Sequence, residues 1–220
     1  MTAVSAESGA PSVVTALYVR TRSLHLEAER TGFIADMLRG AASRRGYALL
    51  MRNLLPAYRQ LEDGLERHRE NSMLRPLARY RLARAPAIAA DLAALTGDDE
   101  LPLLPEGNSY AQAIAHAAEG DGSRLIAHAY TRYLGDLNGG QIVRRLLEKS
   151  LGLGPRELTH YDFSDIGEPA ALKSGYRHAL EQAGVAAADP EAIIAEGVVA
   201  FQCNIALSIA VQRHLSGAAA

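Results

Sequence analysis

The chain has 220 residues, a length that allows one domain with a substantial hydrophobic core or two small ones. Its 23 basic and 25 acidic residues give a net charge of -2, so it lacks the basic excess that nucleic-acid binding requires. No apolar run approaches the roughly 18 residues of a membrane-spanning helix. The single cysteine, Cys203, excludes an internal disulfide and favours a reducing cytoplasm.

The first eleven residues differ in composition from the rest of the chain. Residues 1–11 are small and polar, without the charged flank and apolar core of a secretory signal, so we expect a disordered lead-in. No later linker is long enough to separate two domains, and no internal repeat is present. We therefore predict a single domain over residues 12–216.

Apolar residues recur at helical spacing along the chain, and no convincing period-two alternation indicates a strand. We therefore predict an all-α fold, an orthogonal bundle of about eight helices. Capping residues, prolines and glycines place these helices at residues 13–30, 34–38, 43–70, 85–95, 110–118, 123–151, 169–184 and 190–215.

The third of these helices has the clearest amphipathic pattern. Ser43 is its expected N-cap, and Pro56 should kink it because the proline ring removes one backbone hydrogen bond. Steps of four and three residues place on one face the side chains Tyr47, Met51, Leu54, Tyr58, Leu61 and Leu65.

The first helix carries a candidate metal ligand. His25 and Glu29 are four residues apart and share a helix face, and Leu24 and Leu26 flank the histidine. A neutral imidazole can bind iron through one ring nitrogen while the other donates to a carboxylate or to water. The alternative is a solvated His–Glu pair on the protein surface.

The segment from His128 to Gln141 has three glycines in six positions within helix-forming sequence. Each costs a helix about 1 kcal/mol relative to alanine, so a compensating reason is expected. Gly135 and Gly139 are four apart and leave one face bare, where a flat ligand could lie against the backbone. The alternatives are a loop at Gly139-Gly140 or a seam for close helix packing.

Polar residues flank both this bare face and a later helix. Arg132 and Asp136 are four apart and placed to form hydrogen bonds beside the glycines. Lys173, Tyr176 and Arg177 share a face of the helix that begins near Pro169. Two cations on one face suit a pair of carboxylates, although a solvated charged face has the same pattern.

Two of these segments resemble a known family. His128 to Gln141 reads as the motif HAYxRYLGDLSGGQ of biliverdin-producing heme oxygenases of the bacterial type, with Asn138 in place of the serine. The first helix is similar to the family's HxxAE motif, with His25, Ala28 and Glu29. The resemblance extends over roughly residues 17–215, including the last helix with Phe201 and Asn204.

The resemblance implies a role for each matching residue. Heme b would be sandwiched between a proximal helix and a glycine-kinked distal helix, with His25 as the axial iron ligand. The heme-binding residues would be His25, Glu29, Tyr130, Gly139, Gly140, Lys173, Arg177 and Phe201. The residues that shape the distal side and supply protons to bound O2 would be Asp136, Arg132, Tyr58, Gly135 and Gly139.

The implied activity is cleavage of heme to biliverdin, CO and ferrous iron with O2 and external electrons. The chain has no flavin or iron–sulfur motif, so a ferredoxin or flavoprotein reductase would supply the electrons, and a bilin-using protein could receive the product. One departure is Tyr18, where the family often has a lysine, and Arg20 or Arg22 could replace that contact. The alternative functions are a heme carrier or sensor without turnover and an unrelated helical protein.

Overall fold

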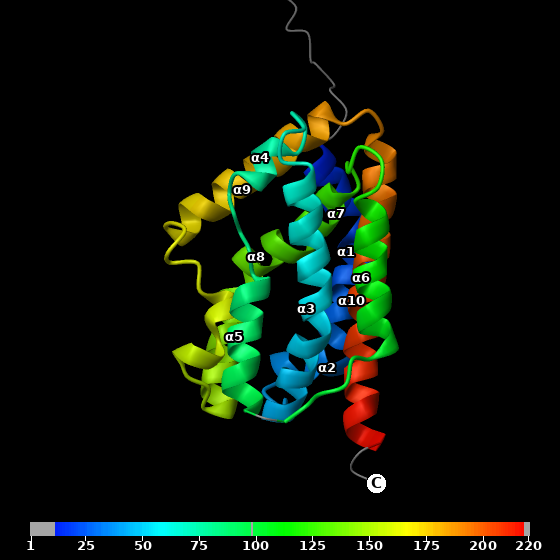
Figure 1. The fold of residues 1–220 in the computed structure, drawn as a ribbon. Coiled ribbons are helices and arrows are strands. Elements are labelled where there is room, and N and C mark those ends of the chain that lie inside the picture. Colours follow the sequence, from blue (N-terminus) through cyan, green and yellow to red (C-terminus); the bar gives the residue numbers. More distant parts are fainter. Residues whose placement is uncertain (1–11, 98, 218–220) are drawn as a thin grey trace, which may run out of the picture.

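The computed structural model describes residues 12–97 and 99–217, and all regular structure within them is helical (Figure 1). The all-α prediction is therefore confirmed, while the lead-in expected at residues 1–11 lies outside the described residues. The α-helices are α1 (Val13–Arg30), α2 (Gly32–Leu38), α3 (Arg44–Arg67), α4 (Arg75–Ala78), α5 (Ala85–Thr96), α6 (Pro105–Ala117), α7 (Leu125–Ala129), α8 (Gly135–Leu151), α9 (Pro169–Ala186) and α10 (Pro190–Gly217). A π-helical turn, η1 (Tyr130–Leu134), joins α7 to α8, and two 3-10 turns, η2 (Pro155–Glu157) and η3 (Thr159–Tyr161), follow α8.

The predicted caps and apolar stripe of α3 are confirmed. The Ser43 hydroxyl accepts a hydrogen bond from the backbone N–H of Gly46, which satisfies one donor of the first turn. Pro56 lies inside the helix without ending it. The six apolar residues of the stripe are all buried: Tyr47, Met51, Leu54, Tyr58, Leu61 and Leu65.

Several predicted boundaries are wrong. Helix α6 begins at Pro105, five residues before Tyr110, because proline is favourable in a first helical turn. Ser123 is not a helix cap, since α7 begins at Leu125, and the predicted segment 123–151 is interrupted by the π-helical turn. The glycine pair Gly139-Gly140 lies within α8, so a loop there is excluded, and the irregularity precedes the glycines rather than falling at them.

Helix α10 also corrects a sequence-based expectation. Its 28 residues are long and apolar enough to cross a membrane by length and composition, although we expected no such run. The helix packs against α1, α2, α6 and α7, and it buries polar side chains such as Asn204 and Ser208 together with its apolar ones. This is the behaviour of a core helix in a soluble protein.

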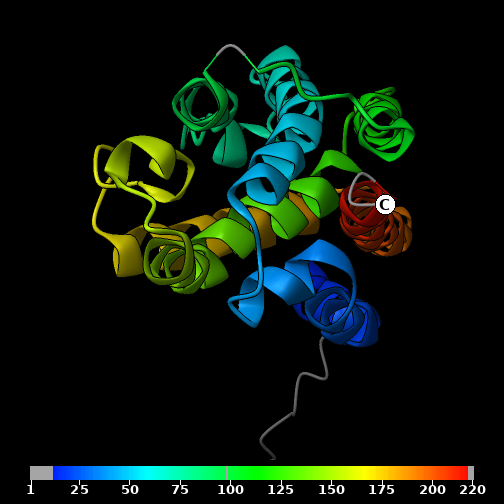
Figure 2. The same ribbon diagram turned by 90° about the horizontal axis from the view of Figure 1, so that it is seen from below.

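The arrangement places the glycine-rich segment in the middle of the bundle. In the view of Figure 2, α7 and α8 run across the centre of the molecule, with α1 and α2 on one side and α3 and α5 on the other. The turn η1 contacts α9 and α10, and α8 contacts α2 and η3. Side chains of the distal segment can therefore reach partners on several helices.

Candidate functional site

His25 lies on α1 with 60% of its side chain exposed. Its Nδ1 atom is 3.5 Å from a carboxylate oxygen of Glu29, and its ring centroid is 5.8 Å from that of Phe201 on α10. Within the part of the chain that the structure describes, no group of three or more His, Cys, Asp or Glu side chains is placed to hold a metal ion.

The three glycines of α8 do not share one role. In the part of the chain that the structure describes, a Cβ atom at Gly135 or Gly139 would meet no other atom within 4 Å, so both positions border open space. A Cβ atom at Gly140 would lie 2.9 Å from the Tyr161 ring, so close packing requires glycine there. Gly135 and Gly139 thus form the bare face expected from the sequence. Gly140 instead fits the alternative hypothesis of a seam for close packing.

Asp136 lies between the two bare positions and is largely buried, with 13% of its side chain exposed. The hydroxyl of Tyr58 on α3 donates a 2.6 Å hydrogen bond to its Oδ2 atom. Burial and the Asp136 charge raise the pKa of Tyr58 well above its ordinary value, so this phenol stays protonated and remains a donor at neutral pH. The carboxylate is consequently fixed by a neighbouring helix.

Arg132, four residues before Asp136, is hydrogen-bonded to α10. Its Nη2 donates a 2.9 Å hydrogen bond to Asn204 on α10, and its buried Nε has no partner among the described residues. Burial lowers the pKa of Arg132, but the surrounding acidic groups, including Tyr110, Tyr58 and Asp136, together outweigh that effect and raise it. The guanidinium is therefore a permanent charge with one unsatisfied donor, which is a place for an ordered water.

Helix α9 carries two of the expected heme-binding residues on its exposed side. Lys173 and Arg177 are exposed on α9, whereas Tyr176 packs edge-on against the Tyr80 and Tyr133 rings in the core. The Tyr176 ring therefore packs in the core against η1 and against Tyr80, which follows α4, while the two cations of the same helix remain exposed. Tyr130 is half-buried. Burial raises the pKa of its phenol, and the positive charge of the nearby Arg177 partly opposes this rise.

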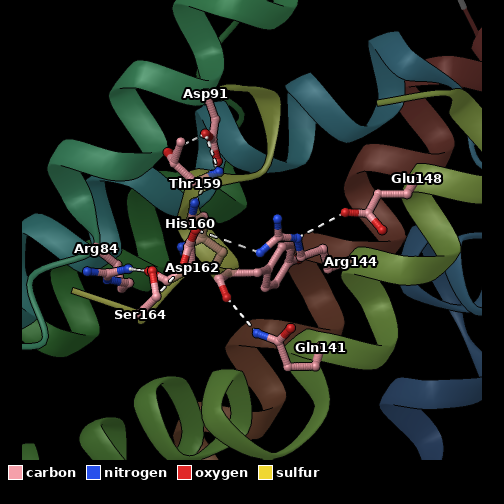
Figure 3. Close-up of polar contacts among 10 residues, drawn as sticks. Arg84, Asp91, Gln141, Arg144, Glu148, Thr159, His160, Asp162 and Ser164 are labelled. Atoms are coloured by element: carbon pink, nitrogen blue, oxygen red, sulfur yellow. Dashed lines mark hydrogen bonds and ion pairs between the residues drawn. The ribbon is translucent and has the colours of Figure 1, made fainter. Parts of the chain in front are cut away.

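Sequence reasoning missed the residues behind Asp136. His160 in η3 is buried, and its Nε2 atom is 3.5 Å from Asp136 Oδ1. Its turn lies in a stretch that we expected to be a loop, and no spacing or motif connects it with α8. Figure 3 shows how polar side chains from α5 and α8 converge on this turn.

These features define a helical protein with an exposed histidine on α1, a bare helix face and a fixed carboxylate beside that face. The family model for heme oxygenase matches residues 12–210. Heme oxygenase 1 of Nostoc sp. is 32% identical over 193 residues, which cover 86% of this chain and 81% of that protein. Heme oxygenase of Guillardia theta is 32% identical over 189 residues, which cover 84% of this chain and 80% of that protein.

A solved structure gives the same result. Heme oxygenase-1 from Synechocystis sp., crystallised in complex with heme, superposes with a TM-score of 0.87 at 28% identity, covering 94% of this chain and 96% of that one. The chain therefore belongs to the heme oxygenase family.

Proposed function

We propose that this chain cleaves heme oxidatively to biliverdin, carbon monoxide and ferrous iron, using O2 and external electrons. The proposal rests chiefly on one combination: His25 is exposed on α1, while Gly135 and Gly139 leave open space on both sides of Asp136. Members of the family with matching folds include one that was crystallised with heme.

Heme b is in this proposal both substrate and cofactor, and when bound it supplies the iron at which O2 is activated. His25 would hold the iron through Nε2, because Nδ1 is turned toward Glu29. A carboxylate beside the second ring nitrogen orients the imidazole and makes it a better donor to a metal. Phe201 contributes an apolar contact to the same ring.

The distal residues prepare the other side of the ligand. Gly135 and Gly139 allow a flat macrocycle to approach the α8 backbone, and Gly140 fixes that helix against Tyr161. Asp136, held by Tyr58, orients water and passes protons toward the open face. Arg132 contributes a buried positive charge and an Nε–H that can hold a water in this network.

The periphery of the site supplies charge for the propionates. Lys173 and Arg177 are exposed cations one turn apart on α9, and Tyr130 lies near Arg177. Tyr18, in place of the family's usual lysine, is more than half exposed on α1. Arg20 and Arg22 are exposed on the same helix and are the proposed substitutes for the lysine charge.

The partners follow from the chemistry. Electrons must come from a separate ferredoxin or flavoprotein reductase, because the sequence has no flavin or iron–sulfur motif. The product would pass to iron metabolism or to a bilin-using protein. We place the activity in the cytoplasm, in a single domain spanning residues 12–216.

The test is turnover of heme by the purified protein with a reductant, with His25→Ala as the informative variant. The variant should fold normally, because the exposed ring contributes little packing, but it should lose its histidine-ligated ferric spectrum and its biliverdin production. Added imidazole should restore part of both. His116→Ala removes another exposed histidine from α6 and serves as the control.

Two outcomes would contradict the proposal. Heme binding without biliverdin in the parent protein would indicate a carrier or sensor. Full turnover by His25→Ala would mean that another of the seven histidines is the iron ligand.

A further inference from the structure

His160 is a buried histidine that the proposed chemistry does not use. Only 2% of its side chain is exposed, and its Nε2 atom lies 3.5 Å from Asp136 Oδ1. The other carboxylate oxygen, Oδ2, accepts the hydrogen bond from Tyr58. The two oxygens of Asp136 are thus approached from two different elements, α3 and η3.

The backbone of His160 is fixed from α5. Asp91, which is fully buried, accepts hydrogen bonds from the backbone N–H groups of Thr159 at 2.8 Å and His160 at 2.9 Å (Figure 3). The Thr159 hydroxyl donates to the same carboxylate. One buried carboxylate therefore organises the start of the 3-10 turn, much as an N-cap residue does for a helix.

The other side of the turn is tied to α8. Gln141 donates a 2.7 Å hydrogen bond from its side chain to the Tyr161 carbonyl, and Arg144 lies 3.9 Å from the Asp162 carboxylate (Figure 3). Because Asp136 belongs to the same helix, the distance between His160 and Asp136 is set by these attachments rather than by a flexible loop.

The surroundings decide which ring nitrogen carries the proton. Nδ1 of His160 is buried and has no hydrogen-bond partner among residues 12–97 and 99–217, whereas Nε2 faces the carboxylate. A buried N–H with no acceptor is costly, so a neutral ring places its proton on Nε2, where it can donate to Asp136. Two aromatic rings pack against the His160 ring and restrict its orientation. The ring centroid of Tyr58 is 5.2 Å away and that of Tyr161 is 4.7 Å away.

We propose that His160 is a positioning residue that donates through Nε2 to Asp136 and, together with Tyr58, fixes the carboxylate that orients water beside Gly135 and Gly139. The expected effect of His160 on turnover rests on the proposed heme oxygenase function, whereas the contact between His160 and Asp136 does not. A separation of 3.5 Å is long for a hydrogen bond, and such contacts often shorten when the ligand is bound.

Two substitutions separate donation from packing. His160→Phe keeps an aromatic ring of similar size but has no N–H, whereas His160→Gln keeps an N–H donor and loses the ring contacts. If the hydrogen bond from His160 matters, His160→Phe should lower biliverdin yield about three- to tenfold, which is the effect of losing one hydrogen bond. Heme affinity should be unchanged. His160→Gln should retain more activity than His160→Phe even if it is the less stable of the two. Pure packing predicts the opposite order.

The contact can also be tested without heme. In the heme-free protein labelled with 15N-histidine, His160 should show a protonated Nε2 and an unprotonated Nδ1, and Asp136→Asn should shift the Nε2 resonance. His116→Phe, on the exposed face of α6, is the control for the loss of a histidine.

The outcomes distinguish failure of this proposal from failure of the proposed function. A proton on Nδ1, or equal biliverdin yields from the parent and His160→Phe, would overturn the positioning role. A parent protein that makes no biliverdin would instead overturn the proposed function, while the tautomer measurement would still report on the contact.

Discussion

At the scale of single residues, Asp136 is the group whose surroundings are most specific. Tyr58 donates to one oxygen, His160 approaches the other, and Arg132 holds a permanent positive charge nearby. A surface carboxylate paired with a cation on its own helix would contribute at most about 1 kcal/mol to stability and nothing to chemistry. The partners of Asp136 come from α3 and η3, which is the arrangement of a preorganised site.

Asp136→Ala should keep heme affinity, because this carboxylate is proposed to hold water and not iron or a propionate. We expect biliverdin yield per heme to fall at least tenfold while reductant is still consumed, since the water that delivers protons loses its anchor. Asp136→Asn should be milder because an amide can still hold a water. Yield and reductant consumption are measured together, with the exposed Asp165→Ala as control. An alanine variant with parental yield would remove Asp136 from the mechanism.

The variant Gly139→Leu tests whether glycine is needed at this position to leave room for the ligand, because helix propensity alone would favour leucine. Leucine favours a helix by about 1 kcal/mol over glycine, and no protein atom would obstruct the first side-chain carbon, so the variant should unfold at higher temperature than the parent. The same side chain would occupy the space proposed for the macrocycle, so heme titration should show weakened or abolished binding. Ser150→Leu, exposed near the end of α8, should leave heme affinity unchanged. Unaltered heme affinity in Gly139→Leu would refute the bare-face argument.

At the scale of elements, the distal segment depends on a turn that follows α8 and is anchored by α5. Asp91 satisfies two backbone donors and one hydroxyl of η3 from a fully buried position. The Asp162 carbonyl accepts a further bond from Arg84, whose guanidinium also lies over the Phe163 ring. The position of the turn η3, and of His160 beside Asp136, therefore depends on the position of α5.

Asp91→Ala should lower the free energy of unfolding by about 3 kcal/mol, because it leaves buried backbone donors without an acceptor. Turnover should fall by more than the loss of folded protein explains, since His160 and Tyr161 lose their fixed position. Chemical denaturation and biliverdin yield of the folded fraction are the measurements. Asp99→Ala, an exposed aspartate after α5, is the matched control. A variant with parental denaturation midpoint would contradict the anchoring role of Asp91.

At the scale of the whole molecule, α10 joins the proximal and distal halves. It packs against α1 and carries Phe201 next to His25, and it also carries Asn204, which binds Arg132. Glu196 on the same helix accepts a 2.9 Å hydrogen bond from the buried His128 of α7. The helix that is apolar enough for a membrane is thus the one that connects the polar network of the bundle.

His128 gives the fold a predictable dependence on pH. Burial lowers the pKa of His128 and the Glu196 carboxylate only partly opposes this, so the folded ring stays neutral below the ordinary value of about 6.5. As pH falls below that value, the unfolded chain gains a proton that the folded chain does not, and stability decreases. His128→Gln cannot titrate, so its melting temperature should fall less between about pH 7.5 and pH 5.5 than that of the parent. An equal fall in both proteins would contradict this assignment, and the exposed His116→Gln serves as control.

The sequence by itself determined the helical class and most helix positions, and it singled out candidate site residues. Local signals suffice for these features: the 3.6-residue spacing of apolar side chains, the Ser43 cap, and a dense motif that contains Arg132, Asp136 and the glycines. Such patterns depend on neighbours three or four residues away, which are present in the sequence itself.

Only the tertiary structure decided which partners these residues have. It turned Arg132 toward Asn204 rather than Asp136, and it placed Gly140 against the Tyr161 ring. It also brought His160 to Asp136 from a segment that the sequence indicated only as a loop. These contacts join residues 21 to 72 positions apart, and their geometry depends on how whole helices pack, which no local periodicity specifies.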